Sequence, residues 1–418
     1  MPAPAPADSG PPDPPRLAHA VALLFSAHAV GLLVPLLTVP WLARVLGPAG
    51  WAPVLVAQAL AAWAILVLEF GFDLAGTRDV AQADSSEAVA HTAAAVQRAR
   101  LLLTPLVATG VVGAALLLGH ELRLLAGTVA YVVARGLSPY WFFQGKQRIR
   151  VAALIDTLGK LLPALAMFAL VQETADAWRV LALQAVGAAL ATAALWIRIH
   201  RQHALPPVTN REALAALQGA APMFAARAAS GLYLQANTLI LSFAAPVAAV
   251  AMYGGAERIV RAAINLLTPL TQALFPRISQ LAKTAPDQAL QEIRHALLVL
   301  TGLAIAGAAV IAVLGTTVIA LLLGGDYTSS VPVLRVLVLT FPLVAAGTVL
   351  GIYWALPWRR EDLFLKAILL GGAVNLTLAV LLVPRWNAMG MTGAVVAAES
   401  CVTAFLALAF YRHIRTAQ

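Results

Sequence analysis

Apolar runs of about twenty residues recur along the whole chain, and about twenty apolar residues are what a helix needs to cross the hydrocarbon of a bilayer. Of the 418 residues, 61% are hydrophobic and only 11% are charged, whereas soluble domains carry about 25% charged residues. We therefore expect an all-α integral membrane protein with about twelve transmembrane helices. The expected spans are 18–42, 51–74, 99–119, 121–143, 151–171, 177–198, 217–242, 247–276, 296–324, 331–357, 363–384 and 389–411.

The basic residues alternate between the connections that join these spans. The even-numbered connections each carry three Lys or Arg and, with the termini, reach 18, against five in the odd-numbered connections. Because cytoplasmic loops carry the excess of Lys and Arg, we expect both termini in the cytoplasm and the protein in the bacterial inner membrane. The net charge of +9 is then a signal of topology, and we expect no nucleic-acid partner.

A basic connection at the middle of the chain divides the expected spans into two sets of six. We expect a disordered, Pro-rich tail at 1–17, an N-terminal lobe at 18–200, a cytoplasmic linker at 201–212 and a C-terminal lobe at 213–418. An even number of spans in each half gives parallel repeats, which hold substrate near the midplane between them.

Ten charged residues fall within or beside the expected spans. A charge at the centre of a span costs about 2.5–3.5 kcal/mol on insertion scales, so it is expected to face a cavity or a partner. Arg227 and Arg258 have no partner nearby in the sequence, and we expect them to line a cavity that takes an anionic substrate, since guanidinium matches phosphate oxygens. The other eight are Arg135, Lys160, Arg261, Glu69, Asp73, Asp156, Glu257 and Glu399.

Local pairing is the alternative for most of these eight. Lys160 and Arg261 each follow an acidic residue by four positions, so each could simply neutralise that residue on one helix face. Arg135 could extend to the cytoplasmic interface. Glu69 and Asp73 could be a solvated helix end or a gate, and Glu399, with no opposite charge close in sequence, is a candidate for coupling to an ion.

The segment PYWFFQGKQRIR, residues 139–150, places four aromatic residues directly before three cations. We interpret the aromatic block as an interfacial belt at the cytoplasmic end of the fourth span. Lys146, Arg148 and Arg150 would then face the lipid headgroups at the cytoplasmic mouth.

Chemistry that the sequence lacks also narrows the function. There is no Walker motif, no metal spacing among the histidines and no recognisable catalytic triad. The single cysteine excludes a disulfide framework. We therefore expect a transporter that is not an enzyme, with no metal site and no cofactor beyond a coupling ion, H⁺ or Na⁺.

Four segments resemble the Wzx flippases of O-antigen and polysaccharide assembly, in the multidrug/oligosaccharidyl-lipid/polysaccharide exporter superfamily. They are LLVPLLTVPWLARVLGPAGW (32–51), LEFGFDLAGTRDVA (68–81), LSPYWFFQGKQRIR (137–150) and GAERIVRAAINLLTPLTQALFPRISQLA (255–282). The chain departs from the family pattern at Glu69, where Asp is usual, and at Asp73, where Asn is common.

This resemblance implies two six-helix lobes of the MATE type around a cationic cavity. It implies transfer of undecaprenyl-pyrophosphate-linked oligosaccharide from the cytoplasmic to the periplasmic leaflet, for O-antigen, capsule or exopolysaccharide assembly. Substrate binding then falls to Arg227, Arg258, Arg261, Arg135 and Lys160, and gating or ion coupling to Glu69, Asp73 and Glu399. A polysaccharide polymerase and a chain-length regulator are the expected protein partners.

Other functions stay open from the sequence. A cation-coupled multidrug exporter of the same superfamily would have an acidic or apolar cavity, which five basic residues in the spans disfavour. A membrane polymerase would need longer external loops than this chain has. A scaffold without transport would leave the charges within the spans unexplained.

Overall fold

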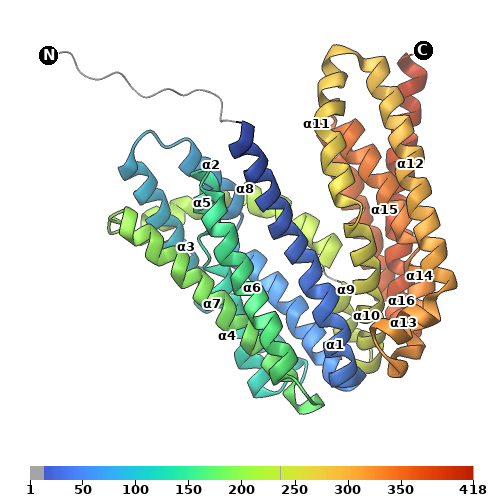
Figure 1. The fold of residues 1–418 in the computed structure, drawn as a ribbon, viewed down its shortest axis with the longest axis horizontal. Coiled ribbons are helices and arrows are strands. Elements are labelled where there is room, and N and C mark those ends of the chain that lie inside the picture. Colours follow the sequence, from blue (N-terminus) through green and yellow to red (C-terminus); the bar gives the residue numbers. More distant parts are fainter. Residues whose placement is uncertain (1–13, 236, 418) are drawn as a thin grey trace.

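The computed structural model describes residues 14–235 and 237–417, and all regular elements within these ranges are helical. This confirms the all-α prediction for the described residues. Two groups of helices meet at one end and diverge toward the other, where α1 begins and α16 ends (Figure 1). The helices are α1 (Pro14–Glu69), α2 (Phe72–Ala81), α3 (Ser86–Leu117), α4 (Leu122–Gly136), α5 (Tyr140–Gly145), α6 (Ile149–Leu170), η1 (Thr174–Asp176), α7 (Ala177–Gln202), α8 (Asn210–Gln235), α9 (Asn237–Ala244), α10 (Val247–Asn265), α11 (Thr268–Thr284), α12 (Pro286–Val313), α13 (Gly315–Leu322), η2 (Gly325–Ser330), α14 (Val331–Leu337), α15 (Thr340–Thr348), η3 (Val349–Ala355) and α16 (Glu361–Ala417).

Seven helical segments among the described residues are long and apolar enough to cross a membrane. The two longest helices each take in two expected spans: α16 contains 363–384 and 389–411, and α1 contains 18–42 and most of 51–74. α1 breaks at Gly47 (φ 61°, ψ 178°), a conformation that glycine adopts readily because it has no Cβ. α16 breaks at Asn387 (φ 47°, ψ −124°). Residues 1–13 of the expected tail lie outside the described residues, and α1 already begins at Pro14.

Apolar side chains cover the outside of the helices as well as the inside. Leu117, Leu122 and Val313 are 84%, 77% and 76% exposed. Such residues are normally among the most buried in soluble proteins, so this surface fits lipid as its solvent.

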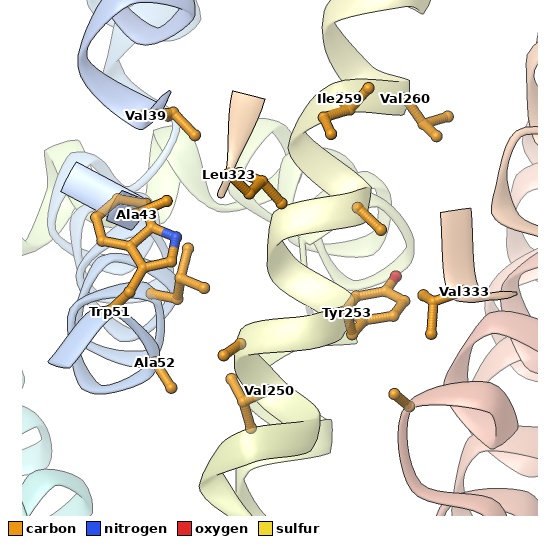
Figure 2. Close-up of a cluster of buried hydrophobic side chains, with 14 of the residues drawn as sticks. Val39, Ala43, Trp51, Ala52, Val250, Tyr253, Ile259, Val260, Leu323 and Val333 are labelled. Carbon is orange, nitrogen blue, oxygen red and sulfur yellow. The ribbon is translucent and has the colours of Figure 1, made fainter. Parts of the chain in front are cut away.

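The largest apolar cluster joins the two halves at one end of the molecule. Trp51 and Leu46 of α1 lie in one cluster with Val250 and Tyr253 of α10 and Val333 of α14, as Figure 2 shows for most of these side chains. Toward the termini the halves have separate clusters, one around Trp141 and Phe72 and the other around Trp354 and Phe410. The two groups of helices are therefore closed at one end and splayed at the other.

The aromatic block at 140–143 packs in the cluster around Trp141 and Phe72. Its interpretation as an interfacial belt is therefore wrong. Trp141, Phe142 and Phe143 are all buried and pack with Phe72 and Val80 of α2. Burying three aromatic rings removes a large apolar area from the interface. α5 is thus a short helix that is anchored inward against α2.

The connection between α7 and α8 is fixed by a capping box at the start of α8. Glu212 Oε2 accepts hydrogen bonds from the Thr209 hydroxyl (2.6 Å) and backbone N–H (2.8 Å), and the Thr209 hydroxyl oxygen accepts from the Glu212 N–H. His91 Nε2 of α3 lies 3.0 Å from Glu212 Oε1. The bonds from the Thr209 hydroxyl and N–H and from His91 lower the pKa of Glu212 to about 2.

α8 packs against both halves of the chain. It contacts α1, α2 and α3 on one side and α16 on the other. Ala213 and Ala220 lie in the cluster around Trp141, with residues of the N-terminal half. The lobe boundaries given above stay a prediction, and α8 is the helix that crosses between the lobes.

Gly76 tests the packing of α2 on the aromatic block. A methyl group at Gly76 would lie 2.7 Å from Cε3 of the buried Trp141 ring, and overpacking costs about 1–3 kcal/mol. We expect Gly76→Ala to lower the melting temperature of the purified protein in detergent. Gly113→Ala is the control, because nothing lies within 4 Å of its added methyl and alanine favours the helix. Equal melting temperatures for the two variants would contradict the described packing.

The capping box predicts a pH dependence of stability. Since the folded-state pKa of Glu212, about 2, lies below the value of about 4.3 for an unfolded chain, its contribution is present above pH ~4.3 and is lost as the pH falls toward 2. We expect the difference in melting temperature between wild type and Glu212→Gln to shrink from about pH 5 to about pH 3. Glu87→Gln, also in the first turn of a helix, controls for loss of a charge near a helix N-terminus. A difference that stays constant over this range would refute the assignment.

Candidate functional site

Four cavities that share lining residues extend from the N-terminal half to the C-terminal half of the chain, and we call them the cavity chain. The first, about 440 Å³, is bordered by Glu69, Arg135 and Arg227. The second, about 330 Å³, shares Gln58, Tyr131, Arg135 and Gln184 with the first. The third, about 460 Å³, is mostly apolar and shares Pro35 and Arg258 with the second.

The fourth cavity, about 290 Å³, shares Arg261 and Asn265 with the third. All five basic residues predicted to bind substrate border at least one cavity of this chain, namely Arg135, Lys160, Arg227, Arg258 and Arg261. Their role in binding stays a prediction. Among the described residues, no group of three or more His, Cys, Asp or Glu is arranged to hold a metal ion.

Arg135 and Lys160 share one carboxylate. Asp156 of α6 pairs with Arg135 of α4 through Oδ1 and with Lys160, one turn along α6, through Oδ2 at 2.7 Å. The expected local pair of Asp156 and Lys160 is confirmed. Arg135 reaches its partner on another helix and does not depend on the interface for its neutralisation. The carboxylate fixes both cations at the wall of the second cavity.

Arg227 pairs with Asp73, which is 154 positions earlier in the chain. The helix breaks between Glu69 and Asp73, where Phe70 (φ 46°) and Gly71 (φ 73°) take left-handed conformations. A Cβ on Gly71 would lie 2.6 Å from the backbone nitrogen of Phe224, so glycine lets α8 approach this turn closely. Phe70 stacks on Phe224 with ring centroids 4.4 Å apart. This packing brings Arg227, one turn further along α8, to Asp73.

The same break puts Glu69 and Asp73 on different helices, although both fall in the expected span 51–74. Glu69 ends α1 and borders the first cavity, whereas Asp73 lies in the first turn of α2. Their function as a gate stays a prediction.

Arg258 links the two halves directly. It lies on α10 and donates a hydrogen bond to Gln58 of α1. Its guanidinium carbon lies 4.9 Å from the centroid of the Trp51 ring, within the range of a cation–π contact. Arg44 of α1 makes a second link, donating to the Leu321 carbonyl at the end of α13.

The fourth cavity gathers polar groups from four helices. Arg261 Nη2 lies 2.9 Å from Glu257 Oε1, which confirms the expected local pair. Thr238 of α9 donates to Glu257 Oε2 at 3.0 Å, and Thr340 of α15 and Glu399 of α16 also border the cavity. Two buried amides meet there, where Asn375 Nδ2 donates to Asn237 Oδ1 at 2.7 Å.

The three cations assigned to the mouth lie outside the cavity chain. Lys146 and Arg148 lie in the turn from α5 to α6, Arg150 lies in the first turn of α6, and Arg148 and Arg150 are exposed. None of the three borders the cavity chain. Their contact with an incoming headgroup stays a prediction.

Sequence reasoning missed the role of Arg100, which is one of the 18 basic residues that were assigned to the cytoplasmic side. Arg100 lies within α3 and is 2% exposed. It donates to the carbonyls of Gly136 (3.2 Å) and Ser138 (2.9 Å) at the end of α4. Its guanidinium faces the rings of Phe72 and Trp141 at 5.7 and 6.0 Å. The signal was present, because Arg100 falls inside the expected span 99–119 between apolar neighbours.

Comparison with known proteins matches this site to a family. The profile of a family described as polysaccharide biosynthesis protein matches residues 17–282, which include all five cavity cations. The chain belongs to this family. Its relatives include proteins assigned as O-antigen transporters in Shigella dysenteriae and in Escherichia coli (strain K12). The first is 27% identical over 394 residues, covering 92% of this chain and 98% of the relative, and the second is 27% identical over 393 residues, covering 91% and 93%. These matches confirm the Wzx-type resemblance.

Solved structures of multi-pass membrane transporters share the fold. The inward closed conformation of the lipid II flippase MurJ has a TM-score of 0.75 at 14% identity, covering 94% of this chain and 87% of that chain. An inward-facing multidrug transporter of the MATE family has a TM-score of 0.69 at 16% identity, with coverage of 91% and 94%. An outward-facing MATE structure superimposes less well, with a TM-score of 0.53 at 15% identity and coverage of 93% of each chain.

A double-mutant cycle tests the inter-helix pair of Arg135 and Asp156. Because both side chains are less than a third exposed, we expect Arg135→Gln and Asp156→Asn to show a coupling of about 1–3 kcal/mol in the free energy of unfolding in micelles. The matched control is the exposed pair of Asp362 and Lys366, whose coupling should be much weaker because water screens it. Additive effects at Arg135 and Asp156 would contradict the pairing.

Proposed function

We propose that this protein is a transporter that moves undecaprenyl-pyrophosphate-linked oligosaccharide from the cytoplasmic to the periplasmic leaflet of the inner membrane. The observation that carries this proposal is the cavity chain, in which cations from both halves line connected spaces. The family and the O-antigen transporters among its relatives support the same substrate class. The product would supply O-antigen, capsule or exopolysaccharide assembly, with a polymerase and a chain-length regulator as later partners.

In the membrane, we propose twelve spans with both termini in the cytoplasm. The breaks in α1 and α16 support two spans in each of these helices, and the distribution of Lys and Arg supports the orientation. The splayed end of the molecule, where the termini lie (Figure 1), then faces the cytoplasm. The molecule would be ready to admit substrate from that side.

Within the cavity chain, the pyrophosphate and sugars would occupy the polar cavities and the polyprenyl tail the apolar one. Arg258 and Arg261 border the apolar third cavity, whose walls include Leu36 and Leu266. Both of these leucines are exposed, so the cavity opens toward lipid. A headgroup bound by the two arginines could thus leave its tail in the bilayer.

Transport would follow by alternating access. Opening the closed end must separate Arg258 from Gln58 and Trp51, and Arg44 from the Leu321 carbonyl. A ligand shifts this equilibrium only by binding the two states differently. Since Arg258 borders the cavities and also joins the halves, an anion bound to it would have that effect. Lys146, Arg148 and Arg150 would receive the headgroup at the mouth, and Glu69, Asp73 and Glu399 would gate the cycle or couple it to H⁺ or Na⁺.

Lipid-linked glycan in cells tests the proposal. We expect deletion of the protein in its host to leave undecaprenyl-pyrophosphate-glycan on the cytoplasmic leaflet, and wild type to restore surface glycan. Arg227→Gln or Arg258→Gln should restore it about tenfold less or worse, because a lost bond to a charged group costs about 1.5–3 kcal/mol. The measurement is the amount of glycan on each leaflet, at matched protein levels in the membrane.

Arg294→Gln is the control, since Arg294 is exposed on α12 and does not border the cavity chain. It should restore surface glycan fully. Unchanged glycan in the deletion strain, with increased sensitivity to cationic drugs, would reject the flippase and favour a multidrug exporter.

A further inference from the structure

Arg261 lies where the apolar third cavity meets the polar fourth cavity, and its side chain borders both. The side chain is 45% exposed, whereas its partner Glu257 is only 14% exposed. A headgroup whose tail occupies the apolar cavity therefore meets Arg261 first and reaches Glu257 only beyond it.

The groups that surround Glu257 come from four helices, α9, α10, α15 and α16. On its own helix it faces Arg261 at 2.9 Å and the Tyr253 hydroxyl at 3.4 Å, with Arg258 the next residue. α9 contributes Thr238, which donates at 3.0 Å, and α15 contributes Thr340. α16 contributes Glu399, a second carboxylate, and the amide of Asn375. Arg261 is attracted to both carboxylates.

Charges along the cavity chain are nearly balanced. Five cations border it against four carboxylates among the described residues, and Asp73, the partner of Arg227, completes the balance. A pyrophosphate entering this space adds negative charge without adding a counter-ion. Charges moved out of water need compensation, so a bound headgroup requires new positive charge or the loss of a negative one.

We propose that the anionic headgroup competes with Glu257 for Arg261, and that the displaced carboxylate takes up a proton from water in the cavity. Binding of the headgroup and binding of a proton are then coupled at one site. This inference rests on the proposed function and assigns the residues that couple proton binding to substrate binding.

When Arg261 turns to phosphate, Glu257 loses the ion pair that it makes at 2.9 Å. Glu257 would share its cavity with Glu399, and two carboxylates in one site disfavour the state in which both are ionised. A protonated carboxyl also becomes a hydrogen-bond donor. Asn375 Oδ1 borders this cavity from a side chain that is 3% exposed, and it has no hydrogen-bond partner among the described residues. The cavity thus contains an acceptor for the added proton.

Calorimetry on the full-length protein in detergent, with farnesyl pyrophosphate as the probe, tests this coupling. Titrations at about pH 7 in buffers of different ionisation enthalpy give the number of protons exchanged on binding. We expect wild type to take up protons, about one more than Glu257→Gln does. An arginine that only bound the probe would favour its ionised form and release protons.

The variants should also show whether Glu257 competes with the headgroup for Arg261 or only stabilises the fold. Glu257→Gln should bind the probe more tightly than wild type, because no carboxylate competes for Arg261, and Arg261→Gln should bind it more weakly. Wild-type affinity should weaken by up to about tenfold per unit rise in pH, and the affinity of Glu257→Gln should not. Asp362→Asn, an exposed acidic residue outside the cavities, should behave as wild type.

Three results would overturn the inference. If wild type binds the probe without taking up protons, the competition between headgroup and Glu257 is rejected and the proposed function is unaffected. The same holds if Glu257→Gln takes up as many protons as wild type. If the affinity for the probe depends on sodium concentration and not on pH, coupling to a proton is rejected. Wild type that does not bind the probe rejects the proposed function and this inference with it. Should Glu257→Gln fail to fold, the sign of proton exchange in wild type still decides.

Discussion

At the end of the molecule away from the termini, Trp51 and Leu46 of α1 pack in the same apolar cluster as Val250 and Tyr253 of α10. Toward the termini the two halves have separate clusters. Closure at one end and separation at the other create the space between the halves. The third cavity lies between the halves and connects the cavities of the N-terminal half to the cavity of the C-terminal half through shared lining residues.

Charge pairing between helices is the second constraint. Charges within spans are costly, and the cavity cations meet that cost through named partners. Arg135 and Lys160 share Asp156, Arg227 pairs with Asp73, and Arg258 binds Gln58. A cation that is held by a carboxylate is available to an anionic substrate only by exchange. Under the proposed function, the near balance of charge makes binding of the headgroup a competition, unlike binding to an open cationic surface.

Local sequence patterns predicted the parts of the site that depend on one helix. Acidic and basic residues four positions apart gave the pairs of Glu257 with Arg261 and of Asp156 with Lys160. Sequence reasoning placed Glu69 and Asp73 in one span, 51–74, but the turn at Phe70 and Gly71 breaks the helix between them. It was also wrong for the aromatic block, since an interfacial ring and a buried ring look alike in sequence until the partner helix is known.

The sequence alone determined that the chain is helical and built for a membrane, which family it belongs to and which residues are charged within spans. These follow from composition, the lengths of apolar runs and local motifs. Only the tertiary structure decided which charges meet, how Arg100 is buried and how the cavities connect. Arg258 and Gln58 are 200 residues apart in the chain, and helical periodicity carries no information over that separation. Their contact arises from the packing of α1 against α10.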